Sequence, residues 1–203
     1  MQQRVAAAAA LAALALGGCA AVVVGGAAVG TAMVVTDRRT AGVQLEDQNI
    51  ELKSLTRIRE TVGERGHVNA TSYNRMVLLT GEVPSEADRS ALEQSITKIE
   101  NVRSTVNELA VMGPSSMTAR SNDTILTSKV KASFIDAKDL HANAVKVVTE
   151  RGVVYLLGRV TEREANRATE LARGVPGVQK VVKVLEILTE AELAALGSEN
   201  KKN

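Results

Sequence analysis

The sequence predicts an α+β fold in which one small unit, ordered helix–strand–strand–helix–strand, occurs twice in tandem. The first observation is a repeat, because the pattern Val-x-Leu-x-Gly-x-Val at residues 77–83 recurs at 154–160. The second is that apolar residues alternate with period two in and before each of these stretches, which is typical of a β-hairpin. The third is helical spacing of apolar residues on both sides of each hairpin. Two helices can then cover one face of a three-stranded sheet.

The repeat extends beyond this strand. Further along the chain, residues 99–102 match residues 175–178 in their apolar pattern. Units of this size bury little apolar surface on their own, so we expect the two copies to pack on each other. We assign the copies to residues 45–112 and 123–188, with a linker over 113–122.

Pattern and turn residues place five elements in the first copy. Asn74-Arg75 forms the turn of its hairpin. Gly81 is placed where the second strand has to bend or to let another backbone come close. The elements are a helix over 46–62, strands over 68–73 and 76–83, a helix over 85–99 and a strand over 102–112.

The second copy repeats this order. Asp123 is predicted as the N-cap of its first helix, because its carboxylate can accept hydrogen bonds from the free N–H groups of the first turn. Gly158 takes the place that Gly81 has in the first copy. Residues 189–203 are predicted as a flexible C-terminal tail in which a short helix through Leu196 can form. The elements are a helix over 123–135, strands over 144–149 and 153–160, a helix over 162–174 and a strand over 178–188.

Residues 1–18 have the three parts of a bacterial lipoprotein signal peptide. Arg4 and an apolar stretch are followed by Leu16-Gly17-Gly18-Cys19, which is a lipobox. We therefore expect cleavage before Cys19, the single cysteine of the chain, and acylation of its thiol and its new amino group. Residues 19–44 then form the lipidated cysteine and a tether rich in small residues. An uncleaved membrane-spanning anchor is the alternative, since residues 20–35 are also apolar, although glycines interrupt that run.

Ala20 follows the acylated cysteine in the expected mature chain. An aspartate at this position commonly retains such lipoproteins in the inner membrane, so alanine favours the inner leaflet of the outer membrane. We expect a lipid-anchored protein that faces the periplasm.

Composition argues against several classes of function. Aromatic residues are few and tryptophan is absent, which disfavours an aromatic-lined pocket and base stacking on nucleic acid. His67 and His141 lie far apart without clustered carboxylates or cysteines, so no metal site is expected. No serine stands in a nucleophile-elbow setting. We expect no catalytic residues, no cofactor and no nucleic-acid partner.

Charge is divided unevenly between the two copies. Residues 45–112 carry 8 basic and 11 acidic residues, whereas residues 123–188 carry 11 basic and 8 acidic residues. The second copy is therefore the candidate for contact with an anionic surface.

The first helix of the second copy carries the candidate binding face. Helical spacing puts Leu126, Val130 and Phe134 within about 80° of one another, which predicts that they form the core stripe. The outward side carries isoleucines beside lysines, a combination that suits a lipid interface. Packing of these isoleucines against the first copy or the linker is the alternative. The candidate phospholipid-binding residues are Ile125, Ser128, Lys129, Lys131, Ala132 and Ile135.

The two copies resemble the BON domain. The resemblance rests on the repeated strand pattern, on the helix that follows it, and on Val175-Pro176-Gly177-Val178. Two such domains behind a lipobox resemble the dual BON-domain outer-membrane lipoproteins, with further similarity at residues 36–40, 122–124 and 158–165. Two positions depart from the pattern: Arg75 stands where glycine is usual in the hairpin turn, and Ile125 stands where some related sequences carry tryptophan.

The resemblance implies a non-enzymatic lipoprotein that supports outer-membrane integrity. It also implies that the second BON domain binds anionic phospholipids such as phosphatidylglycerol and cardiolipin. A periplasmic adaptor that docks proteins of envelope assembly or cell division is the alternative function.

Overall fold

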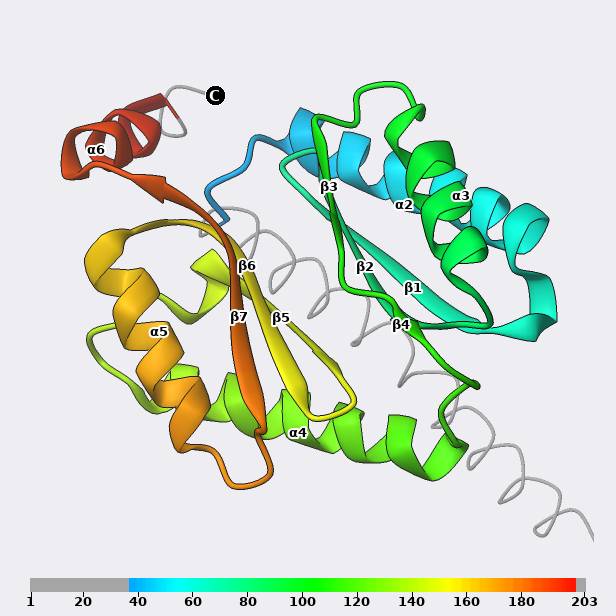
Figure 1. Cartoon of the computed structure of the whole chain (residues 1–203). Coiled ribbons are helices and arrows are strands. Elements are labelled where there is room, and N and C mark those ends of the chain that lie inside the picture. Colours follow the sequence, from blue (N-terminus) through cyan, green and yellow to red (C-terminus); the bar gives the residue numbers. More distant parts are fainter. Residues whose placement is uncertain (1–36, 200–203) are drawn as a thin grey trace, which may run out of the picture. The chain divides into compact units, whose positions relative to one another are not determined.

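The computed structural model describes residues 37–199, and the chain from Arg38 onward forms one compact unit. Each predicted copy folds into a sheet with two long helices, so the α+β class and the tandem repeat are confirmed (Figure 1). Cys19, the predicted signal peptide and the tether up to residue 36 lie outside the described residues. We call the two repeats the first and the second domain.

The first domain has a mixed sheet with β2 at its centre. Strand β1 pairs with β2 in the antiparallel sense, and β3 and β4 both pair with β2 in the parallel sense. The last strand was predicted to run without interruption over 102–112, and this was wrong. It is broken at Glu108-Leu109, because Leu109 turns into the core and its N–H donates to the Asn107 side chain. The elements are α2 (Ala41–Thr61), the short helix η1 (Gly63–Arg65), β1 (His67–Tyr73), β2 (Met76–Val83), α3 (Glu86–Thr97), β3 (Ser104–Asn107) and β4 (Ala110–Val111).

The second domain repeats this arrangement with an unbroken last strand. Strand β6 is central, antiparallel to β5 and parallel to β7 along nine residue pairs. Gly158 of β6 lies directly against the backbone oxygen of Ala144, so a side chain has no room there. The elements are α4 (Met117–Asp136), the short helix η2 (Ala142–Ala144), β5 (Val145–Glu150), β6 (Val153–Thr161), α5 (Glu162–Gly174) and β7 (Lys180–Leu188).

The first helices of both domains begin earlier than predicted. Helix α4 begins at Met117, and the Ser116 hydroxyl accepts from the Ala119 N–H as its N-cap. The prediction of Asp123 as N-cap was therefore wrong, and the linker shortens to residues 113–116. Asp123 lies in the middle of α4, buried, and its carboxylate accepts hydrogen bonds from backbone N–H groups of the β5–β6 turn. Helix α2 likewise begins at Ala41, not at residue 46, with Thr40 as its N-cap.

Each domain has its own core between the helices and one face of the sheet. Leu126, Val130 and Phe134 of α4 are buried against β5 and β6, which confirms the predicted core stripe. In the first domain α2 and α3 lie over one face of the sheet (Figure 1), and the equivalent cluster fills the space between them. Burying such a side chain contributes about 1.5–3 kcal/mol, so these clusters supply most of each domain's stability.

A third cluster joins the two domains. It draws Tyr73 and Leu78 from the first sheet and Tyr155, Leu157 and Val184 from the second, all on the sheet faces turned away from the helices. This cluster explains why β2 and β6 are buried on both faces. The two copies therefore pack on each other, as their small size predicted.

A helix follows β7 directly. Residues 190–199 form α6 (Glu190–Glu199), which confirms the predicted short helix through Leu196 and extends it to residue 199. The Thr189 hydroxyl accepts from the Glu192 N–H, and the Glu192 carboxylate accepts from the Thr189 N–H. This reciprocal pair is a capping box, which starts the helix directly after β7.

Candidate functional site

The six predicted phospholipid-binding residues all lie on α4, and all six are exposed. Ile125 is 54% exposed and Ile135 is 73% exposed. An isoleucine side chain that faces water contributes no hydrophobic stabilisation to the fold. The alternative, in which they pack against the first domain or the linker, does not match this exposure. Helix α4 therefore presents apolar side chains outward while its opposite stripe fills the core.

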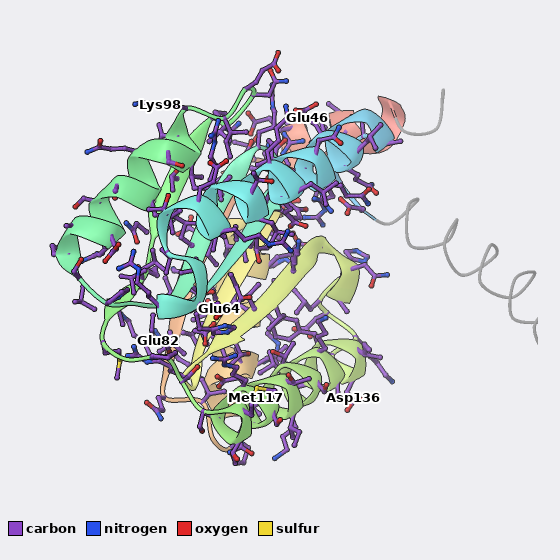
Figure 2. All side chains as sticks on the ribbon, turned by 90° about the vertical axis from the view of Figure 1, so that its right-hand side faces the viewer. Glu46, Glu64, Glu82, Lys98, Met117 and Asp136 are labelled. Carbon is purple, nitrogen blue, oxygen red and sulfur yellow. The ribbon has the colours of Figure 1, made fainter. Side chains whose placement is uncertain are left out.

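The outward side of α4 continues to Met117, which is 74% exposed. Figure 2 shows Met117 and Asp136 at the two ends of this helix. Met117 and Ile135 fall on the same line along the helix, about five turns and about 27 Å apart. Sequence reasoning missed Met117 because it began the helix at Asp123. The signal that marks it is the serine immediately before it, which is a strong N-cap residue.

The outward side carries no charged residue along its centre. Along this centre lie Met117, Ser121, Thr124, Ile125, Ser128, Ala132 and Ile135, which we call the α4 face. The hydroxyls of Ser121, Thr124 and Ser128 donate to backbone carbonyls one turn earlier in the helix, over 2.9–3.0 Å. Because these hydroxyls are already hydrogen-bonded, moving them out of water costs less than moving free hydroxyls.

Lysines border the α4 face on both sides. At about 100° per residue, Lys129 falls on one rim and Lys131 on the other. Both are exposed, and neither forms an ion pair with a described residue. Asp136, which is exposed at the C-terminal end of α4, falls close to the rim of Lys129. A face of apolar and hydrogen-bonded hydroxyl side chains, with lysines at both rims, is typical of a helix that lies in a membrane interface.

Two shallow hollows lie beside the α4 face. One, of about 480 Å³, is lined by Ile125, Lys129 and the Pro176-Gly177 turn. The other, of about 550 Å³, lies further along α4, between Ala132 and Leu171 of α5. Lys129 lines both hollows.

The described residues offer little for metal chemistry. Within residues 37–199 no three histidine, cysteine, aspartate or glutamate side chains gather as metal ligands. His67 lies at the start of β1, and burial lowers its pKa.

No helix among the described residues is both long enough and apolar enough to cross a bilayer.

The model of the BON domain matches the chain twice, over residues 46–113 and 122–189.

Several proteins are similar to this chain in sequence. The chain is 40% identical over 160 residues to the outer membrane lipoprotein DolP of Haemophilus influenzae, covering 77% of this chain and 82% of that protein. It is 30% identical over 151 residues to a 21 kDa hemolysin of Actinobacillus pleuropneumoniae, covering 73% and 78%. It is also 30% identical over 117 residues to the osmotically-inducible protein Y of Escherichia coli, covering 56% and 58%. The resemblance seen in the sequence is thereby confirmed.

Proposed function

The chain belongs to the family of outer-membrane lipoproteins with two BON domains, and from this premise we propose that it binds anionic phospholipid through the α4 face of its second domain. The proposed role is non-enzymatic. Binding of this kind would attach the second domain to the inner leaflet of the outer membrane and so support membrane integrity.

The observation that carries the proposal is the exposure of Ile125 and Ile135 beside Lys129 and Lys131, which form no ion pair with a described residue. The isoleucines would enter the boundary between headgroups and acyl chains, where their apolar surface leaves water. The lysines at the rims would meet the phosphates, since their long stems let the ammonium groups reach them. The hydrogen-bonded hydroxyls on the face reduce the cost of this transfer.

The expected affinity is low without the lipid anchor. Each half-buried isoleucine contributes about 1 kcal/mol and each lysine about 1 kcal/mol near an anionic leaflet. The sum of about 4 kcal/mol corresponds to a dissociation constant of about 1 mM. Such a contact becomes effective only when acylation of Cys19 already holds the chain at the surface.

Co-sedimentation of residues 37–203 with liposomes tests the proposal. The fragment is suitable because Arg38 onward forms one compact unit. Vesicles of phosphatidylcholine with and without phosphatidylglycerol or cardiolipin are used at about 5 mM lipid, above the expected dissociation constant. We expect binding to the anionic vesicles only, and loss of it in Ile125→Glu.

The matched control is Ile187→Glu in the same domain. Ile187 of β7 is 52% exposed, close to the value for Ile125, but it lies away from α4. This control is expected to bind like the wild type. Equal binding to neutral vesicles, or equal loss in both variants, would contradict the proposal.

A second candidate function, a protein-interaction adaptor, is favoured by one observation in the first domain. Leu45, Leu52 and Leu55 of α2 are 59%, 63% and 44% exposed and share one side of the helix. Three exposed leucines at this spacing suit contact with another helix. In-cell crosslinking that recovers one stoichiometric protein partner, together with no lipid binding by the fragment, would favour the adaptor.

A further inference from the structure

Two consecutive arginines at the start of the folded region bond to different domains. Arg38 reaches the second domain, and Arg39 remains on the first. We propose that Arg38-Arg39 is a strap that fixes the end of the lipid tether to both domains at once, and that this contact shields the tether from cleavage by trypsin-like proteases.

Arg38 makes the contact with the second domain. Its guanidinium donates two parallel hydrogen bonds to the Glu164 carboxylate, at 2.8 and 2.7 Å, and a third to the backbone oxygen of Arg159, at 2.8 Å. The side chain of Arg38 is 10% exposed and that of Glu164 is 1% exposed. A forked, buried pair of this kind is among the strongest polar contacts in proteins, and a lysine cannot reproduce it.

The partner of Arg38 is itself held in place. Glu164 forms the capping box of α5 with Thr161, so hydrogen bonds within the second domain also hold its carboxylate in position. The Arg38 guanidinium lowers the pKa of Glu164 to about 2, and the capping bonds act in the same direction. The carboxylate therefore stays ionised throughout the pH range of a living cell.

Arg39 makes the contact with the first domain. Its guanidinium donates to the Asp47 carboxylate at 2.8 Å and lies over the ring of Tyr73, 4.1 Å from its centre. The side chains of Arg39 and Asp47 are 13% and 4% exposed. Tyr73 also belongs to the cluster that joins the two sheets, so the strap ends at the junction of the domains.

The strap changes how the anchor is connected to the second domain. Along the chain, the tether reaches that domain only after the whole of the first domain. Through Arg38 it is attached to the start of α5 directly. A protease that cleaves after arginine has to take this side chain into its own pocket, which requires release from Glu164.

Limited trypsin digestion of the full-length chain, purified in detergent, tests the strap. Mass spectrometry follows the fragments that begin at Arg39 or Thr40. In Glu164→Gln we expect cleavage after Arg38 to become at least about tenfold faster, because a neutral amide loses the charge-assisted fork. Glutamine keeps the capping box, so α5 itself is retained. Cleavage after Arg59, which is exposed on α2, reports any general unfolding.

Glu162→Gln is the matched control, because Glu162 is an exposed carboxylate in the same turn of α5. It is expected to digest like the wild type. Arg38→Lys keeps the charge opposite Glu164 but loses the fork, and it should also be cleaved faster after residue 38 at an unchanged rate after Arg59. Wild-type rates after residue 38 in both Glu164→Gln and Arg38→Lys would overturn the proposal. The digestion involves no lipid vesicles, so its failure is distinct from failure of phospholipid binding.

Discussion

Asp47 in the first domain and Asp123 in the second hold equivalent structural positions. Each is a buried aspartate in the first helix of its domain, and its carboxylate binds the hairpin turn of the same domain. Asp47 accepts hydrogen bonds from the N–H groups of Asn74 and Arg75, and Asp123 accepts from those of Arg151 and Gly152. All four turn residues have positive φ angles, between 50° and 72°. The carboxylates thus support a left-handed turn that non-glycine residues adopt reluctantly.

Replacing Asp123 by asparagine should lower the free energy of unfolding by about 2–3 kcal/mol. Both oxygens of Asp123 accept, at 2.7 and 2.8 Å, and an asparagine would turn an NH₂ group toward one of these N–H donors. Urea denaturation measures the change. Asp136→Asn, an exposed site on the same helix, is the control and should stay within about 0.5 kcal/mol of the wild type. Equal effects of both substitutions would contradict the role of Asp123.

The elements that could be predicted from the sequence are those in which apolar residues recur with a regular period. Strands β2 and β6 and the stripe Leu126, Val130 and Phe134 all face a core, so burial dictates their spacing. The first turns of α4 carry no such signal, since none of residues 117–122 belongs to a buried apolar cluster. The actual hydrogen-bond partner of Asp123, the hairpin turn, lies 28 residues away along the chain. The local sequence around Asp123 therefore suggested only an N-cap.

The same limit applies to the candidate site. Exposure of Ile125 and Ile135 followed from the helix pattern, because the core stripe fixes which side faces out. Met117 and the hydrogen-bonded hydroxyls could not be assigned to the face in the same way, because their assignment depends on where the helix begins. The contact between Arg38 and Glu164 joins residues 126 positions apart, and no local pattern encodes such a pair.

Replacing Gly158 by alanine should destabilise the second domain by more than about 2 kcal/mol. A Cβ atom at this position would collide with the backbone oxygen of Ala144, which flexible side chains cannot relieve. Gly174→Ala is the contrasting control, because a Cβ there meets nothing and alanine favours the last turn of α5 by about 0.5 kcal/mol. The midpoint temperature of thermal unfolding should therefore fall in Gly158→Ala and rise in Gly174→Ala. If Gly158→Ala leaves the unfolding temperature unchanged, β6 and the backbone at Ala144 can move apart without loss of stability.

Glu150 should make the domain interface less stable as the pH rises. It is buried, accepts a hydrogen bond from the Asn69 side chain, and lies near Thr80, Glu82 and Asp123. Burial raises its pKa above the ordinary value of 4.5, so the folded state holds the proton longer than the unfolded chain. This contribution is fully present below pH 4.5 and is lost as the pH rises through the folded pKa.

Glu150→Gln tests this, because glutamine is neutral and can still accept from Asn69. At about pH 7 the variant should be more stable than the wild type, and at about pH 4 the difference should vanish. Urea denaturation at the two pH values measures it. A variant that is less stable than the wild type at neutral pH would mean that ionised Glu150 contributes favourably, which is the opposite of the effect expected from its burial.

The rim lysines should set the salt dependence of membrane binding. Each of Lys129→Gln and Lys131→Gln removes about 1 kcal/mol of attraction to an anionic leaflet, so each should weaken binding to phosphatidylglycerol vesicles about fivefold. The double variant should also respond less to salt between about 50 and 300 mM, since fewer charges are screened. Lys98→Gln on the first domain, an exposed lysine away from α4 (Figure 2), should change neither quantity. If Lys98→Gln weakens binding as much as Lys129→Gln, net charge and not the α4 face governs the attraction.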